Sequence, residues 1–148
     1  MRVLVQRVKE ATCLTESHAP VTIGEGMLLY VSFRVGDDVS LVAKMAKKVV
    51  HLRIFSDASD KLNLSILDKQ YDLLSISQFT LEGDTRKGHR PSFTHAMPPQ
   101  EAAHFFQLFN DELRRYDVTV KVGYFQEAME IVSTNDGPVT LWLDSDDV

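Results

Sequence analysis

The chain has 148 residues, of which 44% are hydrophobic and 25% are charged, and its formal net charge is −5. This composition suits one folded domain, residues 1–148, and excludes intrinsic disorder. The acidic charge argues against sequence-blind adhesion to nucleic acid, while leaving room for a small basic site. No apolar run approaches the roughly 18 residues of a membrane helix, and the alternating N-terminus lacks the features of a signal peptide. We therefore expect a cytoplasmic protein without membrane contact.

The first half of the chain is predicted to hold three strands and one helix. Arg2–Val8 alternates apolar and polar residues, as a half-buried strand does, and residues 19–26 contain a short strand before a turn. Met27–Phe33 is a continuous apolar run, which predicts a central strand buried on both faces. Valines at three- to four-residue spacing predict a helix over Val39–Arg53, with an aspartate cap before it and His51 packed near its apolar face.

The second half is predicted to hold a helix and further strands. Residues 64–67 and Tyr71–Phe79 are expected to be strands, and Glu82–Met97 is a long polar loop. Two prolines, Pro98 and Pro99, mark the start of a second helix. Three more strands are expected, in residues 118–125, 128–134 and 138–143. Two main helices among so many strands predict an α+β fold class, a single domain with a mixed or barrel-like β-sheet.

The segment Asn135–Thr140 reads "NDGPVT" and lies between two apolar, strand-like runs. Proline cannot donate to a sheet ladder, and glycine weakens a strand, so the segment needs an explanation. Asp-Gly is a common hairpin turn, which gives an ordinary structural interpretation. Alternatively the backbone is functional, because a Gly-Pro bond readily adopts the cis form and would present a rigid wall without side chains. Both interpretations stay open at this point.

The usual catalytic signatures are missing from the sequence. The five histidines have no zinc-site spacing, and there is no phosphate-binding glycine loop or G-x-S-x-G elbow. The single cysteine, Cys13, excludes an intrachain disulfide and is expected to be a packed side chain. "SQFTL", Ser77–Leu81, ends a predicted strand. There Thr80 is a candidate nucleophile without an adjacent base, and Phe79 is either a core residue or a platform on which a base stacks.

Taken together, these motifs resemble those of the D-aminoacyl-tRNA deacylases, the D-Tyr-tRNA deacylase family. "SQFTL" is followed by "GHRPSF" at residues 88–93 and by "NDGPVT", and the similarity extends from "VLVQRV" to "GPVTLWL". The resemblance implies a D-Tyr-tRNA deacylase-like fold and a cytosolic homodimer with its active site at or near the subunit interface. It also implies hydrolysis of the ester between a D-amino acid and the terminal adenosine of tRNA, with glycine accepted as well and with no metal or other cofactor.

The resemblance also implies roles for individual residues. The catalytic residues would be Ser77, Gln78, Phe79 and Thr80. The residues of substrate binding and chiral selection would be Asn135, Gly137, Pro138, Val139 and Thr140, with Arg7 supporting their loop. A cis Gly137–Pro138 wall would enter the partner subunit's site and exclude L-amino acids. Backbone N–H groups near Phe79 and Thr80 would stabilise the oxyanion, a tRNA ribose hydroxyl would help to activate water, and Phe79 would line the adenine pocket.

Three basic loop residues, Lys87, His89 and Arg90, are candidates for contacts with acceptor-stem phosphates, although a solvated loop explains them equally well. Two features depart from the family pattern: Phe33-Arg34, where a small residue is expected, and the acidic segment Asp144–Val148. Three alternative functions stay open. They are a related deacylase with a trans Gly-Pro bond that accepts L-alanine, a non-catalytic RNA- or partner-binding module, and a hydrolase of small D-amino-acid esters or peptides that needs no tRNA.

Overall fold

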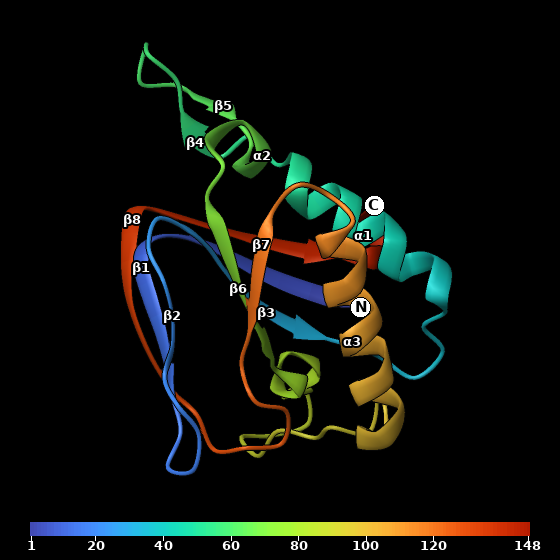
Figure 1. Cartoon of the computed structure of the whole chain (residues 1–148). Coiled ribbons are helices and arrows are strands. Elements are labelled where there is room, and N and C mark those ends of the chain that lie inside the picture. The colour runs from blue at the N-terminus through green and yellow to red at the C-terminus, as the bar shows by residue number, and fades with distance from the viewer.

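The computed structural model describes all 148 residues, Met1–Val148, and shows one six-stranded mixed sheet covered on one face by helices (Figure 1). The strands of this sheet are β1 (Arg2–Leu14), β2 (Val21–Ile23), β3 (Gly26–Ser32), β6 (Asp72–Ser77), β7 (Thr119–Val122) and β8 (Glu130–Asp144). Their order is β2-β1-β3-β6-β7, with β8 paired to β1 as well. β3, β6 and β7 run parallel to one another, whereas β1 is antiparallel to each of its neighbours. The predicted α+β class and mixed, barrel-like sheet are confirmed.

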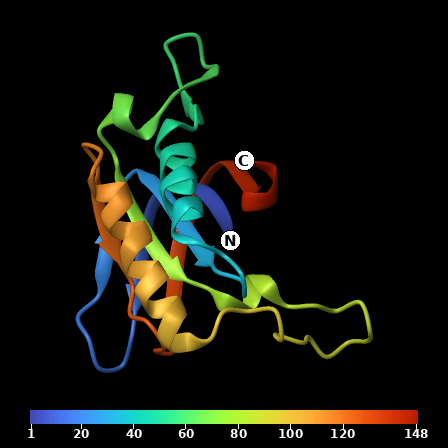
Figure 2. The same cartoon turned by 90° about the vertical axis from the view of Figure 1, so that its right-hand side faces the viewer.

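Two long helices pack beside each other against the sheet, as expected from the sequence (Figures 1 and 2). Helix α1 spans Val39–His51, and the side chain of Asp38 caps it by accepting a 2.8 Å hydrogen bond from the Ser40 backbone. Helix α3 spans Pro99–Arg114 and opens with the predicted proline, whose missing N–H is not needed in a first turn. Their apolar faces join β1, β3 and β6 in the main core.

The central strand β3 carries apolar side chains on both faces, so both faces of the sheet must be covered there. Met27 and Leu29 face the main core, whereas Leu28 belongs to a smaller buried cluster on the other face, together with Cys13. Both predictions, a two-sided strand and a packed cysteine, are confirmed. Burial raises the pKa of the Cys13 thiol above its ordinary value. A protonated, enclosed thiol is a poor nucleophile, so this side chain serves packing.

Two local predictions were wrong. Residues 64–67 do not form a strand, because β5 (Leu62–Leu64) ends there and the short helix α2 (Ile66–Lys69) follows. Ser65 and Asp68 make a reciprocal capping box, a helix-start signal that the apolar pattern concealed. β5 pairs instead with β4 (Phe55–Ser56) in a small hairpin. His51 is exposed, and its ring meets Tyr116 edge-on instead of packing in the core.

The "NDGPVT" segment lies within one continuous strand, so the predicted break between residues 134 and 138 and the hairpin interpretation are both wrong. β8 pairs with β1 at both ends of the segment, with Thr140 opposite Gln6 and Asn135 opposite Val8. Residues 136–139 of β8 therefore face a single residue of β1, Arg7. A bulge of this kind leaves extra residues outside the ladder, which is where a proline can be accommodated in a sheet.

Candidate active site

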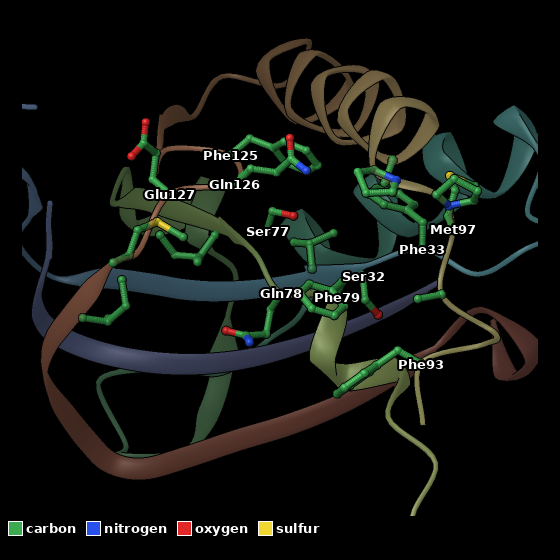
Figure 3. A pocket seen from close by; sticks show the side chains of 18 residues that line it. Ser32, Phe33, Ser77, Gln78, Phe79, Phe93, Met97, Phe125, Gln126 and Glu127 are labelled. Atoms are coloured by element: carbon green, nitrogen blue, oxygen red, sulfur yellow. The ribbon is translucent and has the colours of Figure 1, made fainter. Parts of the chain in front are cut away.

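A pocket of about 460 Å³ opens between the end of β6, the start of α3 and the segment that follows β7 (Figure 3). Eleven of its 18 lining residues are hydrophobic, so it is an apolar cavity with a few polar groups, as small-molecule sites usually are. Ser77, Gln78 and Phe79 of the "SQFTL" motif lie along one side. Phe125 and Gln126 face the pocket from the segment after β7.

Within the motif the backbone passes from an extended strand to a 3₁₀ turn, and this turn positions the side chains of the motif. β6 ends at Ser77, and the Gln78 amide donates a 2.7 Å hydrogen bond to the carbonyl of Val31 on the neighbouring strand. A 3₁₀ turn, η1, then spans Phe79–Glu82. Leu81 donates to the Gln78 carbonyl at 3.2 Å, and the side-chain amide of Gln78 donates to the hydroxyl of Thr80. The Thr80 side chain is exposed and does not line the pocket.

Phe79 is not a core residue. It is 56% exposed, and its ring meets Phe93 edge-on with 5.2 Å between the ring centroids. Phe93 belongs to the "GHRPSF" segment, so two of the three motifs of the resemblance, "SQFTL" and "GHRPSF", meet at this wall of the pocket. An exposed aromatic ring that is held by another aromatic ring is suited to stacking on a flat ligand.

The opposite wall was not predicted from the sequence. Phe125, Gln126 and Glu127 line the pocket there. Tyr124 stacks on His18 with 4.2 Å between the ring centroids, and Nε2 of His18 lies 3.3 Å from a carboxylate oxygen of Glu127. The available signal was the run of large and polar side chains directly after β7, before the last strand begins. The sequence pattern instead predicts a strand over residues 118–125 and no element at Gln126 and Glu127.

The second group of predicted site residues lies away from this pocket within the chain. Asn135, Gly137, Pro138 and Thr140 are exposed on β8, whereas Val139 is half-buried against the main core. None of them lines the pocket. The bond between Gly137 and Pro138 is cis. One chain therefore brings Ser77, Gln78 and Phe79 together but not these residues with them.

Arg7 does contact the motif on β8. Its Nε donates a 3.0 Å hydrogen bond to the backbone carbonyl of Asp136, and its Nη1 donates a 2.8 Å hydrogen bond to the carbonyl of Ile54. The Asp136 carboxylate lies 3.4 Å from Nε as well. Because Arg7 is buried, these contacts are shielded from competing water. The guanidinium thus supplies donors where the strand ladder of β1 and β8 is interrupted.

The polar loop Glu82–Met97 projects from the body of the molecule (Figure 2). Lys87, His89 and Arg90 are exposed on it and do not line the pocket. Arg86 forms a bidentate pair with Asp84, at 2.9 and 2.6 Å. These hydrogen bonds, together with one from the Arg86 backbone, lower the pKa of Asp84 below its ordinary range.

The two departures from the family pattern meet in space. Phe33 is buried and lines the pocket, whereas the Arg34 guanidinium contacts Asp144 at 2.8 Å and Asp146 at 3.3 Å. Burial alone would raise the pKa of Asp144, but the Asp146 N–H and two arginines lower it below its ordinary value. The acidic segment is therefore partly neutralised by an arginine from the other unusual position.

The chain has no group of three or more His, Cys, Asp or Glu side chains placed to hold a metal ion. None of its helices combines the length and the apolar character needed to cross a lipid bilayer.

The family model and the sequence relatives identify one family, and two solved structures share the fold. The family model described as D-Tyr-tRNA(Tyr) deacylase matches residues 4–144. A D-aminoacyl-tRNA deacylase of Thermomicrobium roseum is 48% identical over 145 residues, covering 98% of this chain and 94% of that protein, and one of Syntrophobacter fumaroxidans is 46% identical, covering 98% and 97%. A solved structure titled c-Myc DNA Unwinding Element Binding Protein has a TM-score of 0.91 at 36% identity, covering 97% and 98%. A probable eukaryotic D-amino acid tRNA deacylase shares the fold, with a TM-score of 0.83 at 18% identity over 96% and 97%.

Proposed function

Because the chain belongs to the D-Tyr-tRNA(Tyr) deacylase family, we propose that it is an enzyme that hydrolyses the ester between a D-amino acid and the terminal adenosine of tRNA. Water adds to the ester carbonyl, and collapse of the tetrahedral intermediate releases the free D-amino acid and the tRNA hydroxyl. The observation that carries the proposal is the pocket at the end of β6, where Ser77, Gln78 and Phe79 meet Phe93. The motif to which the family resemblance assigns catalysis lies beside a ligand-sized cavity, which supports the proposal.

The proposed catalysis depends on the backbone of the 3₁₀ turn η1. Leu81 donates the first hydrogen bond within this turn, so the amides of Phe79 and Thr80 precede it and are available to an oxyanion. No histidine or carboxylate lies within the "SQFTL" motif to act as a base, and a ribose hydroxyl of the tRNA is proposed to help activate water. An aminoacyl ester is already labile, so the required barrier reduction is modest.

Thr80 is proposed to orient the substrate without being acylated. Its hydroxyl already accepts a hydrogen bond from the Gln78 side chain, and no imidazole or carboxylate contacts it to remove its proton. Thr80→Ala should therefore retain measurable turnover of D-Tyr-tRNA. A variant with no residual turnover, or an acyl-enzyme trapped by acid quench and mass spectrometry, would assign the nucleophile to Thr80 and overturn this mechanism.

Recognition of the tRNA end is proposed to rest on Phe79, whose exposed ring would stack on the terminal adenine. The basic residues Lys87, His89 and Arg90 stand on the projecting loop and would contact acceptor-stem phosphates. A local basic loop would reconcile the net charge of −5 with an RNA substrate. Binding would then weaken with added salt by only a small slope, because few phosphates are contacted.

Chiral selection is proposed to require a second copy of the chain. Gly137 and Pro138 are exposed on β8 but absent from the pocket of their own chain. β8 pairs only with β1, so its other edge is free, and Val132 and Trp142 on the same strand are each 52% exposed. In the proposed homodimer the Gly137–Pro138 backbone enters the partner subunit's pocket and leaves no room for an L side chain. Glycine, which has no side chain, would be accepted. We propose that the dimer acts in the cytoplasm.

The test is deacylation of four substrates by the purified protein: D-Tyr-tRNA, L-Tyr-tRNA, Gly-tRNA and L-Ala-tRNA, each with and without EDTA. Rapid loss of the D-Tyr and Gly esters, with both L esters spared and no effect of EDTA, is the expected result. Loss of L-Ala-tRNA would favour the related L-alanine deacylase. D-Tyr ethyl ester in a parallel assay detects a hydrolase that needs no tRNA. Hydrolysis of none of these esters, with tRNA binding retained, would assign the protein to the binding modules.

A further inference from the structure

A buried carboxylate lies directly behind the candidate active site. Glu82 is only 3% exposed, although glutamate is rarely buried without partners. Both of its oxygens are engaged. Oε1 accepts a 2.5 Å hydrogen bond from the hydroxyl of Ser32, and Oε2 lies 3.2 Å from Nη1 of Arg2. Glu82 does not line the pocket, whereas Ser32 does. The carboxylate is thus enclosed between the pocket wall and an arginine.

Glu82 is also the last residue of the turn η1, whose first two residues are Phe79 and Thr80. Ser32 is the last residue of β3, so the Ser32–Glu82 hydrogen bond ties the end of the turn to the end of the central strand. Arg2 adds a second tether, because its Nη1 also donates a 2.8 Å hydrogen bond to the carbonyl of Leu81. Two consecutive residues of the turn are therefore held from two different strands.

Arg2 itself is fixed by contacts on its far side. Its Nε donates a 3.1 Å hydrogen bond to Oδ2 of Asp144, and its guanidinium lies 5.4 Å from the ring centroid of Trp142. The other oxygen of Asp144 accepts a 2.8 Å hydrogen bond from Arg34. A long side chain that is restrained at this many points loses little further freedom when it binds Glu82. We call the four residues Ser32, Glu82, Arg2 and Asp144 the turn clamp.

We propose that Glu82 is a positioning residue for the ester hydrolysis: through the turn clamp it holds the turn η1 so that the Phe79 and Thr80 amides meet the oxyanion. Glu82 cannot act on the substrate itself, because both oxygens are engaged and neither faces the pocket. The inference rests on the proposed function for its chemistry. A displacement of about 1 Å in a catalytic group can cost about a hundredfold in rate, so a tether behind the turn has a catalytic consequence.

Three variants distinguish a positioning role of Glu82 from a general effect on the stability of the fold. Glu82→Ala removes the hydrogen bond from Ser32 and the ion pair with Arg2, and leaves only the hydrogen bond from Arg2 to the Leu81 carbonyl. Glu82→Gln keeps the contacts with both Ser32 and Arg2, because its oxygen can accept from Arg2 while its amide donates to the Ser32 hydroxyl, which is free to rotate. Val49→Ala, in α1, is the matched control: Val49 is fully buried in the main core and does not line the pocket. It should lower the melting temperature through a cavity without touching the turn clamp.

We expect Glu82→Ala to lower kcat for D-Tyr-tRNA at least about tenfold, with KM within about twofold of the wild type. Glu82→Gln should keep kcat within about threefold, and Val49→Ala should leave kcat per folded molecule unchanged. An unchanged kcat in Glu82→Ala overturns the proposal, and so does an equal loss of kcat in Val49→Ala.

Amide hydrogen exchange supplies a second readout that needs no activity. The amides of Leu81 and Gly83, which close the turn through Gln78 and Thr80, should exchange at least about tenfold faster in Glu82→Ala and at the wild-type rate in Glu82→Gln. Val49→Ala, measured under conditions where it stays folded, should also show the wild-type rate. If the wild type hydrolyses no ester, the proposed function fails, and exchange then decides separately whether Glu82 fixes the turn. Equal exchange in Glu82→Ala and wild type overturns the positioning role.

Discussion

Substituting Gly137 by alanine tests whether the bulge of β8 has room for a side chain. The φ angle of Gly137 is +119°, a conformation that L-residues rarely adopt. A Cβ atom there would lie 2.8 Å from Nη2 of Arg7, 3.1 Å from Cγ2 of Val139 and 3.2 Å from its backbone nitrogen. A free arginine end would swing aside at little cost. Here Nε and Nη1 of Arg7 already donate to the carbonyls of Asp136 and Ile54, so the guanidinium cannot move without losing them.

The magnitude follows from two separate costs. Holding alanine at this φ costs about 1–3 kcal/mol. Displacing Arg7 from one charged hydrogen bond costs about 1.5–3 kcal/mol more, because the bond is buried. Gly36→Ala is the matched control, since Gly36 has φ +93° and its added Cβ meets nothing within 4 Å. The control carries the first cost alone, so Gly137→Ala should melt about 3–12 °C below it in a domain of this size.

The assay is thermal unfolding of both variants, followed by deacylation of D-Tyr-tRNA and L-Tyr-tRNA below their melting temperatures. We expect Gly137→Ala to lose D-Tyr-tRNA hydrolysis, because the added methyl group would obstruct the proposed site, whereas Gly36→Ala should stay active. Equal melting temperatures for the two variants would refute the argument from Arg7. Full activity with an unchanged preference for D over L in Gly137→Ala would refute the proposed chiral wall.

Three further predictions concern Phe79, Phe109 and Asp144. Phe79→Ala should weaken binding of the tRNA end by about 1–3 kcal/mol in a filter-binding titration, with little change in stability because the ring is 56% exposed; unchanged affinity would remove the stacking role. Phe109→Ala should lower the free energy of unfolding in urea by about 3–5 kcal/mol, since Phe109 is fully buried; a loss below about 1 kcal/mol would contradict the core described above. The pKa of Asp144 is lower in the folded chain than the roughly 3.9 of an unfolded one, so its carboxylate stabilises the fold above that value and stops doing so as pH falls through the folded pKa. The stability difference between wild type and Asp144→Asn should therefore shrink from about pH 6 to about pH 3 in urea titrations, and a constant difference would contradict the paired carboxylate.

Local signals predicted the elements that depend on periodicity alone. Asp38 and the spacing of Val42, Ala46 and Val49 define α1, and a proline marks the start of α3. Prediction failed where two signals competed. The apolar side chains of residues 64–67 are typical of a strand, but the capping box of Ser65 and Asp68 starts a helix there. His51 follows the helical period yet is exposed, because the helix ends there.

Only part of the site could be predicted, because some of its residues are adjacent in sequence and others are brought together by the fold. Ser77, Gln78 and Phe79 are adjacent in sequence, so one motif was enough to indicate them. Phe125 reaches the pocket from a segment whose placement depends on tertiary contacts, whereas Glu82 follows the motif directly and lies behind the pocket without lining it. Glu82 in particular looked like an ordinary polar residue at the start of a loop. Its burial follows only once Arg2 and Ser32, 80 and 50 positions away, have been brought beside it.

The six residues of the "NDGPVT" motif do not determine the conformation of the β8 bulge by themselves. Four residues, 136–139, stand opposite Arg7 alone, so the ladder cannot satisfy all of their backbone groups. The side chain of Arg7 replaces part of the missing ladder by donating to the carbonyl of Asp136, and it joins the bulge to Ile54 beside β4. Because these partners lie 129 and 47 positions from Arg7, the conformation of "NDGPVT" is a property of the folded sheet. Any grafted copy of the motif should therefore need an arginine at the facing position of the neighbouring strand.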